Sequence, residues 1–110
     1  MYTKAMQLGK PKKKTTRNFT PKVKEEIFER DNYRCIKCGS YRVENVPHHI
    51  HYKSQGGIGE KQNGATVCPY CHDWAHHKRN SVFGEPSKEG KEWFESWRDA
   101  NLDANGDMKI

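Results

Sequence analysis

Two C-x-x-C pairs constrain the fold of this chain more than any other feature of its sequence. They are Cys35/Cys38 and Cys68/Cys71, in a chain of 110 residues of which 33% are hydrophobic and 31% charged. A chain this short and polar buries too little apolar surface to fold comfortably without a staple. The four cysteines are the obvious staple, either as disulfides or as a metal site.

The surroundings of the two pairs favour a metal. No apolar leader opens the chain and no apolar run could span a membrane, so a reducing compartment is expected. There, C-x-x-C pairs more often bind zinc, and a redox role is the weaker interpretation because no strand-helix-strand pattern surrounds either pair. Four thiolates complete a tetrahedral site and leave no position for water. We therefore predict a structural Zn²⁺ bound by Cys35, Cys38, Cys68 and Cys71.

The rest of the pattern predicts a small α+β domain between two tails. The first helix starts at Thr20-Pro21, an N-cap followed by proline at the first helical position. The expected elements are a helix over 20–30, strands over 46–52 and 66–68, a short helix over 70–78 and a last helix over 88–102 capped by Ser87. An aromatic stripe on the last helix indicates core packing, with base stacking as the weaker alternative; it comprises Trp93, Phe94, Trp97 and Ala100. Residues 103–110 resemble a calcium loop only faintly and are expected to be a frayed tail.

An excess of positive charge suits a polyanionic partner. The net charge is +6, and contacts between cations and phosphates release counterions, so nucleic acid is the first candidate. A membrane surface is disfavoured because no basic amphipathic helix is visible. Residues 1–19 are expected to be a disordered basic arm that follows phosphates, although a solvated tail or a nuclear localisation signal would look similar. The candidate contacts in the arm are Lys12, Lys13, Lys14 and Arg17. Outside the arm they are Lys53, Lys78 and Arg79, for which a place in a general basic face is the stronger interpretation.

A set of histidines forms a second chemical group. His72 and His76 are spaced i, i+4 and share one face of the short helix. If one residue of the adjacent pair His48-His49 reaches them, three imidazoles leave a coordination position open, and the other could act as general base. Neighbours on an ideal strand point to opposite faces, so both can serve one site only at a strand end, a bulge or a strong twist. His51 shares a face with His49 and is the natural competitor.

The order of these residues resembles the HNH endonucleases, whose core is the ββα-metal motif. The likeness covers residues 30–78 and rests on His48-His49-Ile50, Gly56-Gly57, Asn63, Cys68-x-x-Cys71-His72 and His76. The opening Arg30-Asp31-x-x-x-Cys35-x-x-Cys38-Gly39 resembles the zinc-bearing members, many of them small phage or mobile-element nucleases. The resemblance implies an HNH nuclease domain over residues 20–102, with its core at 30–78, acting in the cytoplasm of a bacterial host cell.

Carried over position by position, the resemblance makes His48 a metal ligand and His49 the general base. Asn63 becomes the asparagine that ties the long loop so that His49 is oriented. His72 and His76 become the helix ligands, with His76 matching the HH-N-H-H subgroup that includes the nuclease colicins and with His77 as its alternative. Many relatives have an aspartate at the position of His48, and three imidazoles shift the preference toward a transition metal such as Zn, Ni or Mn. The candidate catalytic ions are Mg, Mn, Ni and Zn.

The function implied is that of a DNA endonuclease, which hydrolyses phosphodiester bonds with one divalent ion and leaves 5′-phosphate and 3′-hydroxyl ends. One alternative is a non-catalytic, zinc-stabilised nucleic-acid-binding module, which has no use for the histidines and Asn63 together. Another is an accessory subunit of a larger machine, such as a phage packaging complex built around a terminase. That role could coexist with cleavage.

Overall fold

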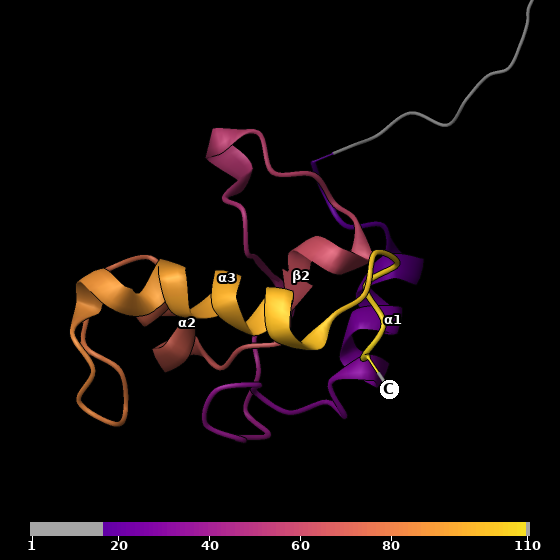
Figure 1. Cartoon of the computed structure of the whole chain (residues 1–110). Coiled ribbons are helices and arrows are strands. Elements are labelled where there is room, and N and C mark those ends of the chain that lie inside the picture. Colours follow the sequence, from indigo (N-terminus) through magenta and orange to yellow (C-terminus); the bar gives the residue numbers. More distant parts are fainter. Residues whose placement is uncertain (1–16, 110) are drawn as a thin grey trace, which may run out of the picture.

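Three α-helices and a two-stranded antiparallel sheet make up the regular structure of residues 17–109, the part of the chain that this computed structural model describes (Figure 1). In chain order the elements are α1 (Pro21–Arg30), β1 (His48–His49), η1 (Lys53–Gln55), η2 (Lys61–Asn63), β2 (Gly64–Ala65), α2 (Pro69–Ala75), η3 (Ser87–Glu89) and α3 (Gly90–Asn101), where η marks a 3-10 turn. The expected small α+β class is confirmed. Within residues 17–109, none of the helices combines the length and the apolar character needed to cross a membrane.

The first helix begins where the sequence places it. The Thr20 hydroxyl accepts a hydrogen bond from the backbone N–H of Val23 at 3.2 Å, and Pro21 occupies the first helical position, where no N–H is needed. Ile27 is the fully buried residue of α1. The helix ends at Arg30, and Asp31 caps it.

The sheet is much shorter than expected. It pairs His48 with Ala65 and His49 with Gly64, so strands over 46–52 and 66–68 are wrong in extent and, for the second strand, in position. The carbonyls of residues 66 and 67 are engaged elsewhere, because Thr66 accepts from the N–H of Ile36 (3.0 Å) and Val67 from that of Glu44 (2.8 Å). The chain after β2 therefore joins the cysteine-bearing loops instead of extending the hairpin.

Helices α2 and α3 lie side by side and enclose the core (Figure 1). They approach so closely that a Cβ added at Gly90 would lie 2.0 Å from the carbonyl oxygen of Trp74. Trp74 and Phe94 are fully buried, and Trp93 and Trp97 pack against them. The aromatic stripe is therefore core, as expected, but Ala100 is exposed. Helix α3 starts at Gly90 without a side-chain cap, because residues 87–89 form η3.

One buried arginine joins elements that are distant in sequence. Arg30 donates from Nε and Nη2 to the carboxylate of Asp31, at 2.8 and 2.9 Å. Its other N–H groups donate to the carbonyls of Lys61 (3.0 Å), Gly64 (2.6 Å) and Gly106 (3.0 Å). All five N–H donors of the guanidinium are thus satisfied. This residue ties α1 to η2, to β2 and to the segment after α3.

The segment after α3 is not frayed. Leu102 pairs with Met108 as an isolated bridge, and Gly106 is buried at a φ of 84°, against Lys61 and Gln62. The carboxylate of Asp103 accepts from the N–H groups of Asn105 (2.9 Å) and Asp107 (3.0 Å), which closes the turn without an ion. The expectation of a frayed tail is therefore wrong for residues 103–109.

Candidate metal centres

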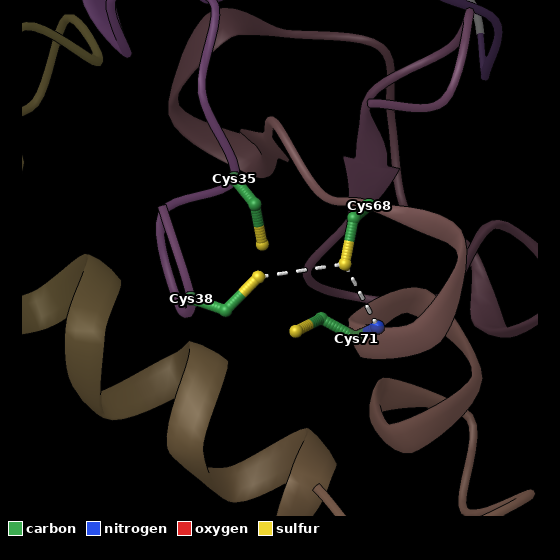
Figure 2. Close-up of side chains that lie close together, drawn as sticks. All are labelled: Cys35, Cys38, Cys68 and Cys71. Atoms are coloured by element: carbon green, nitrogen blue, oxygen red, sulfur yellow. Dashed lines mark hydrogen bonds between the residues drawn. The ribbon is translucent and has the colours of Figure 1, made fainter. Parts of the chain in front are cut away.

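The four cysteines form one cluster between α2 and the loop after α1. Figure 2 shows the four sulfur atoms converging on a common centre, and each lies within 4.8 Å of the others. The sulfur atoms of Cys38 and Cys68 are 3.6 Å apart, and all four residues are free thiols. The cluster could hold a metal ion such as zinc with sulfur on every side.

Two tight turns aim these sulfurs inward. In the first, the N–H of Gly39 donates to the carbonyl of Cys35 at 2.8 Å, and the positive φ of Gly39 (80°) lets the chain double back. In the second, Cys68 is the N-cap of α2, and its sulfur accepts from the N–H of Cys71 at 3.4 Å. Both turns are C-x-x-C knuckles of the kind that the sequence predicts.

The pKa values of the cysteines in this cluster are shifted in opposite directions. A hydrogen bond from the thiol of Cys71 lowers the pKa of Cys35 well below its ordinary value. The same bond, together with burial, raises the pKa of Cys71, and burial raises that of Cys68. The thiolate form of Cys35 is thus favoured even without a metal, and a thiolate is the form that binds a divalent cation. A bound cation would also favour the thiolate form of the other three cysteines.

Three histidines form a second cluster, between β1 and α2. The ligand atoms of His48, His72 and His76 lie within 4.8 Å of one another. The ring of His48, only 1% exposed, has its centroid 5.2 Å from that of His72 and 5.1 Å from that of His76. Both of its nitrogens are buried without a hydrogen-bond partner among the described residues. A buried unsatisfied polar group costs about 1–3 kcal/mol, and an ion bound to one of the two nitrogens would remove the cost for that nitrogen. The residues present therefore fit a metal.

A carboxylate outside the predicted set supports this cluster. The Nδ1–H of His72 donates to Oε1 of Glu44 at 3.0 Å, which leaves Nε2 of His72 to bind an ion. Histidines that bind metals commonly donate their second nitrogen to a carboxylate in this way. Glu44 is held in place by its own N–H, which donates to the carbonyl of Val67. It lies in a loop with no periodic pattern, so nothing in the sequence singled it out.

The third member of the cluster is His76, not His77. His76 caps the C-terminus of α2 and stacks on the ring of Tyr52, at 4.7 Å between centroids and 20° between planes. The hydroxyl of Tyr52 donates to the carbonyl of Ala75, which fixes the aromatic ring beneath the imidazole. His77 leaves the helix at a φ of 64° and is exposed. Tyr52 is a second residue that the sequence did not indicate.

Burial and neighbouring charge favour the neutral form of two imidazoles in the cluster, those of His48 and His76. Burial lowers the pKa of His48 well below its ordinary value, and the neighbouring His72 and His76 lower it further. Burial, followed by the charge of His72, also lowers the pKa of His76. Neutral imidazole is the form that binds a metal, so these shifts favour an ion at neutral pH.

His49 stands on the wall of a cavity that the cluster also borders. This cavity has a volume of about 940 Å³, and its lining includes His49, His72, His76, Glu44 and Tyr52. His49 is the last residue of β1, and a strand end is one of the places where adjacent side chains can border the same site. His48 lies buried behind the cavity while His49 borders it. Burial lowers the pKa of His49, so this ring too is neutral at neutral pH.

Asn63 fastens the loop between the two strands. Its Oδ1 accepts from the N–H of His51 at 2.7 Å, and its Nδ2 donates to the carbonyls of His51 (3.1 Å) and Ile58 (3.0 Å). These three bonds end on loop backbone and not on the His49 ring. His51 itself is exposed, with Nε2 3.1 Å from the carbonyl oxygen of Gln55.

The predicted nucleic-acid contacts fall into three groups. Arg17 and Lys53 border the cavity, together with Lys24, which the sequence did not single out. Arg79 lies over the ring of Tyr70 at 3.6 Å and borders a separate hollow of about 380 Å³, while Lys78 is exposed. The arm residues Lys12, Lys13 and Lys14 lie outside the described residues.

Comparison with known proteins identifies the region that holds both clusters. The sequence model of the HNH endonuclease family matches residues 35–78. Among curated proteins, the chain is similar to Anaredoxin from Nostoc sp. (strain PCC 7120 / SAG 25.82 / UTEX 2576), with 31% identity over 55 residues that cover 50% of this chain and 72% of that protein. No solved structure gives a significant match.

Proposed function

Residues 35–78 carry an HNH endonuclease domain, and on this premise we propose that the chain is a metal-dependent DNA endonuclease that hydrolyses phosphodiester bonds. One observation carries the proposal. His48 is buried beside His72 and His76, next to a cavity that His49 borders, and neither of its ring nitrogens has a partner within residues 17–109. A binding module without catalysis has no reason to keep such a costly group in its interior.

The order β1, β2, α2 supports a ββα-metal core in this proposal. His48, His72 and His76 would hold the catalytic ion, and Glu44 would fix His72 with Nε2 toward it. A divalent ion bound there supplies positive charge that stabilises the transition state of phosphodiester hydrolysis. The physiological ion in this proposal is Mg, Mn, Ni or Zn.

His49 has the role of general base. Its ring borders the cavity and is neutral at pH 7, because burial lowers its pKa, so it can accept a proton from a water molecule in the cavity. The attack of that water on phosphorus would release the 3′-oxygen and leave a 5′-phosphate. Asn63 contributes by holding the loop over 51–63 against the strand ends.

The cysteine cluster has no part in the reaction. Four sulfur ligands leave no open position, so a zinc ion there would stabilise the fold alone. Arg17, Lys24 and Lys53 border the cavity and would contact DNA phosphates near the reacting bond. Lys78, Arg79 and the cations of the arm, Lys12, Lys13 and Lys14, would extend this contact along the backbone of the duplex.

A plasmid-nicking assay tests the proposal. The chelated protein is supplied with Mg, Mn, Ni or Zn in turn, and relaxation of supercoiled DNA is measured for the wild type and for His49→Ala. We expect the variant to lose about 10²- to 10⁴-fold in cleavage rate, the usual contribution of a general base, while its zinc content and thermal transition persist.

His51→Ala is the matched control. His51 is two residues from His49, but its ring bonds to the carbonyl of Gln55, and only its backbone meets Asn63. Truncation of this side chain should therefore leave cleavage within about twofold of the wild type. Cleavage that survives in His49→Ala at the wild-type rate would remove this residue from the mechanism.

A further inference from the structure

The ring of His49 is held by a segment that precedes the first helix. Its Nε2 lies 2.5 Å from the carbonyl oxygen of Arg17, and its ring centroid lies 4.2 Å from that of Phe19, with the two planes tilted by 32°. Phe19 is 6% exposed, although it comes from a region expected to be a disordered arm. We call Arg17–Phe19 the N-terminal segment.

The contact with Arg17 determines which nitrogen of His49 carries the proton. A carbonyl oxygen can only accept a hydrogen bond, so Nε2 must be the protonated nitrogen of the neutral ring. The lone pair is then on Nδ1. A histidine whose tautomer and plane are both fixed presents its basic nitrogen in one direction, which is the requirement for a general base.

We propose that the N-terminal segment is the positioning element of His49, with the Arg17 carbonyl fixing its tautomer and Phe19 fixing its ring plane. This inference rests on the proposed function, because it gives His49 the role of base. The family resemblance gave Asn63 both the task of fastening the loop and that of orienting His49, and the inference divides these two tasks. Asn63 fastens the loop, and the N-terminal segment orients the base.

The packing of the segment shows that it is built into the domain. A Cβ added at Gly59 would lie 2.2 Å from the carbonyl oxygen of Asn18 and 2.9 Å from the nitrogen of Phe19. A Cβ at Gly64 would lie 3.1 Å from Cζ of Phe19. The segment thus occupies the space that Gly59 leaves open and shares with Ile27 the space beside Gly64, and Thr20 begins α1 directly after it. A segment that only covered the site and could leave it would not need to pack this closely against both Gly59 and Gly64.

The first test measures kcat and KM for nicking by the full chain and three variants. Phe19→Ala should lower kcat by about 10- to 100-fold with little change in KM, because the ring of His49 loses its support. Phe19→Leu keeps most of the apolar volume and should lose less. Arg17→Ala keeps the backbone carbonyl that bonds to His49 but removes a cation that borders the cavity, so it should raise KM by more than it changes kcat.

Zinc content and the thermal transition are measured for each variant. If Phe19→Ala fails to fold, Phe19→Leu provides the comparison, because its smaller cavity preserves the domain. A kcat that is unchanged in every folded Phe19 variant would overturn the proposal. A kcat that rises would also overturn it, since the segment would then be a cover over the base.

The second test reads the tautomer directly and does not depend on cleavage. Two-bond ¹H–¹⁵N correlation spectra of the full-length, zinc-loaded chain identify the protonated nitrogen of His49. We expect Nε2–H in the wild type and a mixture of tautomers in the Phe19 variants. Nδ1–H in the wild type would overturn the inference. A wild type that shows Nε2–H but cuts no DNA with any ion would instead refute the proposed nuclease function.

Discussion

The cysteine cluster and the histidine cluster are both tight groups of ligand atoms but have opposite relations to solvent. In each, the ligand atoms lie within 4.8 Å of one another. Three of the four cysteines are buried and the fourth is half-buried, whereas the histidines grade from buried His48 through half-buried His72 to exposed His76. A closed sulfur site suits a structural ion, while an imidazole site that opens onto a cavity suits one that meets a substrate.

A second contrast shows why the histidine cluster is informative. The fold can satisfy a demanding buried group completely, because all five N–H donors of Arg30 find acceptors. Nevertheless, neither ring nitrogen of His48 has a hydrogen-bond partner in the described part of the chain. Arg30 and His48 lie in the same small domain, and buried polar groups are normally paired. A metal ion that binds to His48 therefore explains its unpaired imidazole best.

The largest expected effect concerns the cysteine cluster. Cys68→Ser should abolish the cooperative thermal transition, because binding of structural zinc contributes on the order of 10 kcal/mol to the folding of small domains. Serine is a good N-cap, so this variant keeps the cap of α2 and isolates the loss of the metal ligand. The measurement is thermal unfolding followed by circular dichroism.

The matched variant in the other cluster is His76→Ala, which removes one exposed ligand. It should keep its transition while it loses the second ion. If Cys68→Ser kept the cooperative thermal transition of the wild type, the division between a structural and a catalytic cluster would be wrong. It would also be wrong if both variants lost their transitions.

An intermediate effect concerns Glu44. Glu44→Gln should weaken the ion bound by the histidine cluster by about 10- to 100-fold, because the amide no longer supplies the negative charge that orients and polarises His72. Isothermal titration with Mn or Ni, on protein whose cysteine cluster already holds zinc, measures the affinity. Affinity equal to that of the wild type would show that Glu44 is a surface partner of His72 and nothing more.

The smallest effect is a gain in stability. His48→Phe replaces a buried ring with unpaired nitrogens by an apolar ring of similar shape among Tyr52 and Phe94. With one equivalent of zinc and no second ion, it should stabilise the domain by about 1 kcal/mol, or several degrees in Tm. The same change should abolish nicking.

The pH dependence of this gain follows from the pKa of His48. Burial lowers that pKa in the folded state, so below about pH 6.5 the unfolded chain binds more protons at this residue than the folded one. The wild type should therefore lose stability as the pH falls from there, and the advantage of His48→Phe should grow. A difference in Tm that stays constant between pH 7.5 and pH 5.5 would contradict this account.

Residue types and spacing in the sequence predicted which ligands would meet. The cysteine pairs and the i, i+4 histidines are local patterns, and both clusters form from the expected members. Strand lengths were not predictable, because the carbonyls of Thr66 and Val67 bond to loops that carry no pattern. Glu44, Tyr52 and Phe19 also come from irregular segments, and only the folded chain shows that they support the histidines. The catalytic roles of His49 and Asn63 stay predictions.

Metal retention measured together with cleavage tests the division between the clusters most directly. Bound ions are counted by native mass spectrometry before and after dialysis against a mild chelator, and nicking is assayed on the same samples. We predict that one zinc per chain is retained, that a second ion is lost, and that nicking disappears and returns when a divalent ion is added. Undiminished nicking after the second ion is lost, or a chain that retains its fold after losing both ions, would contradict the account.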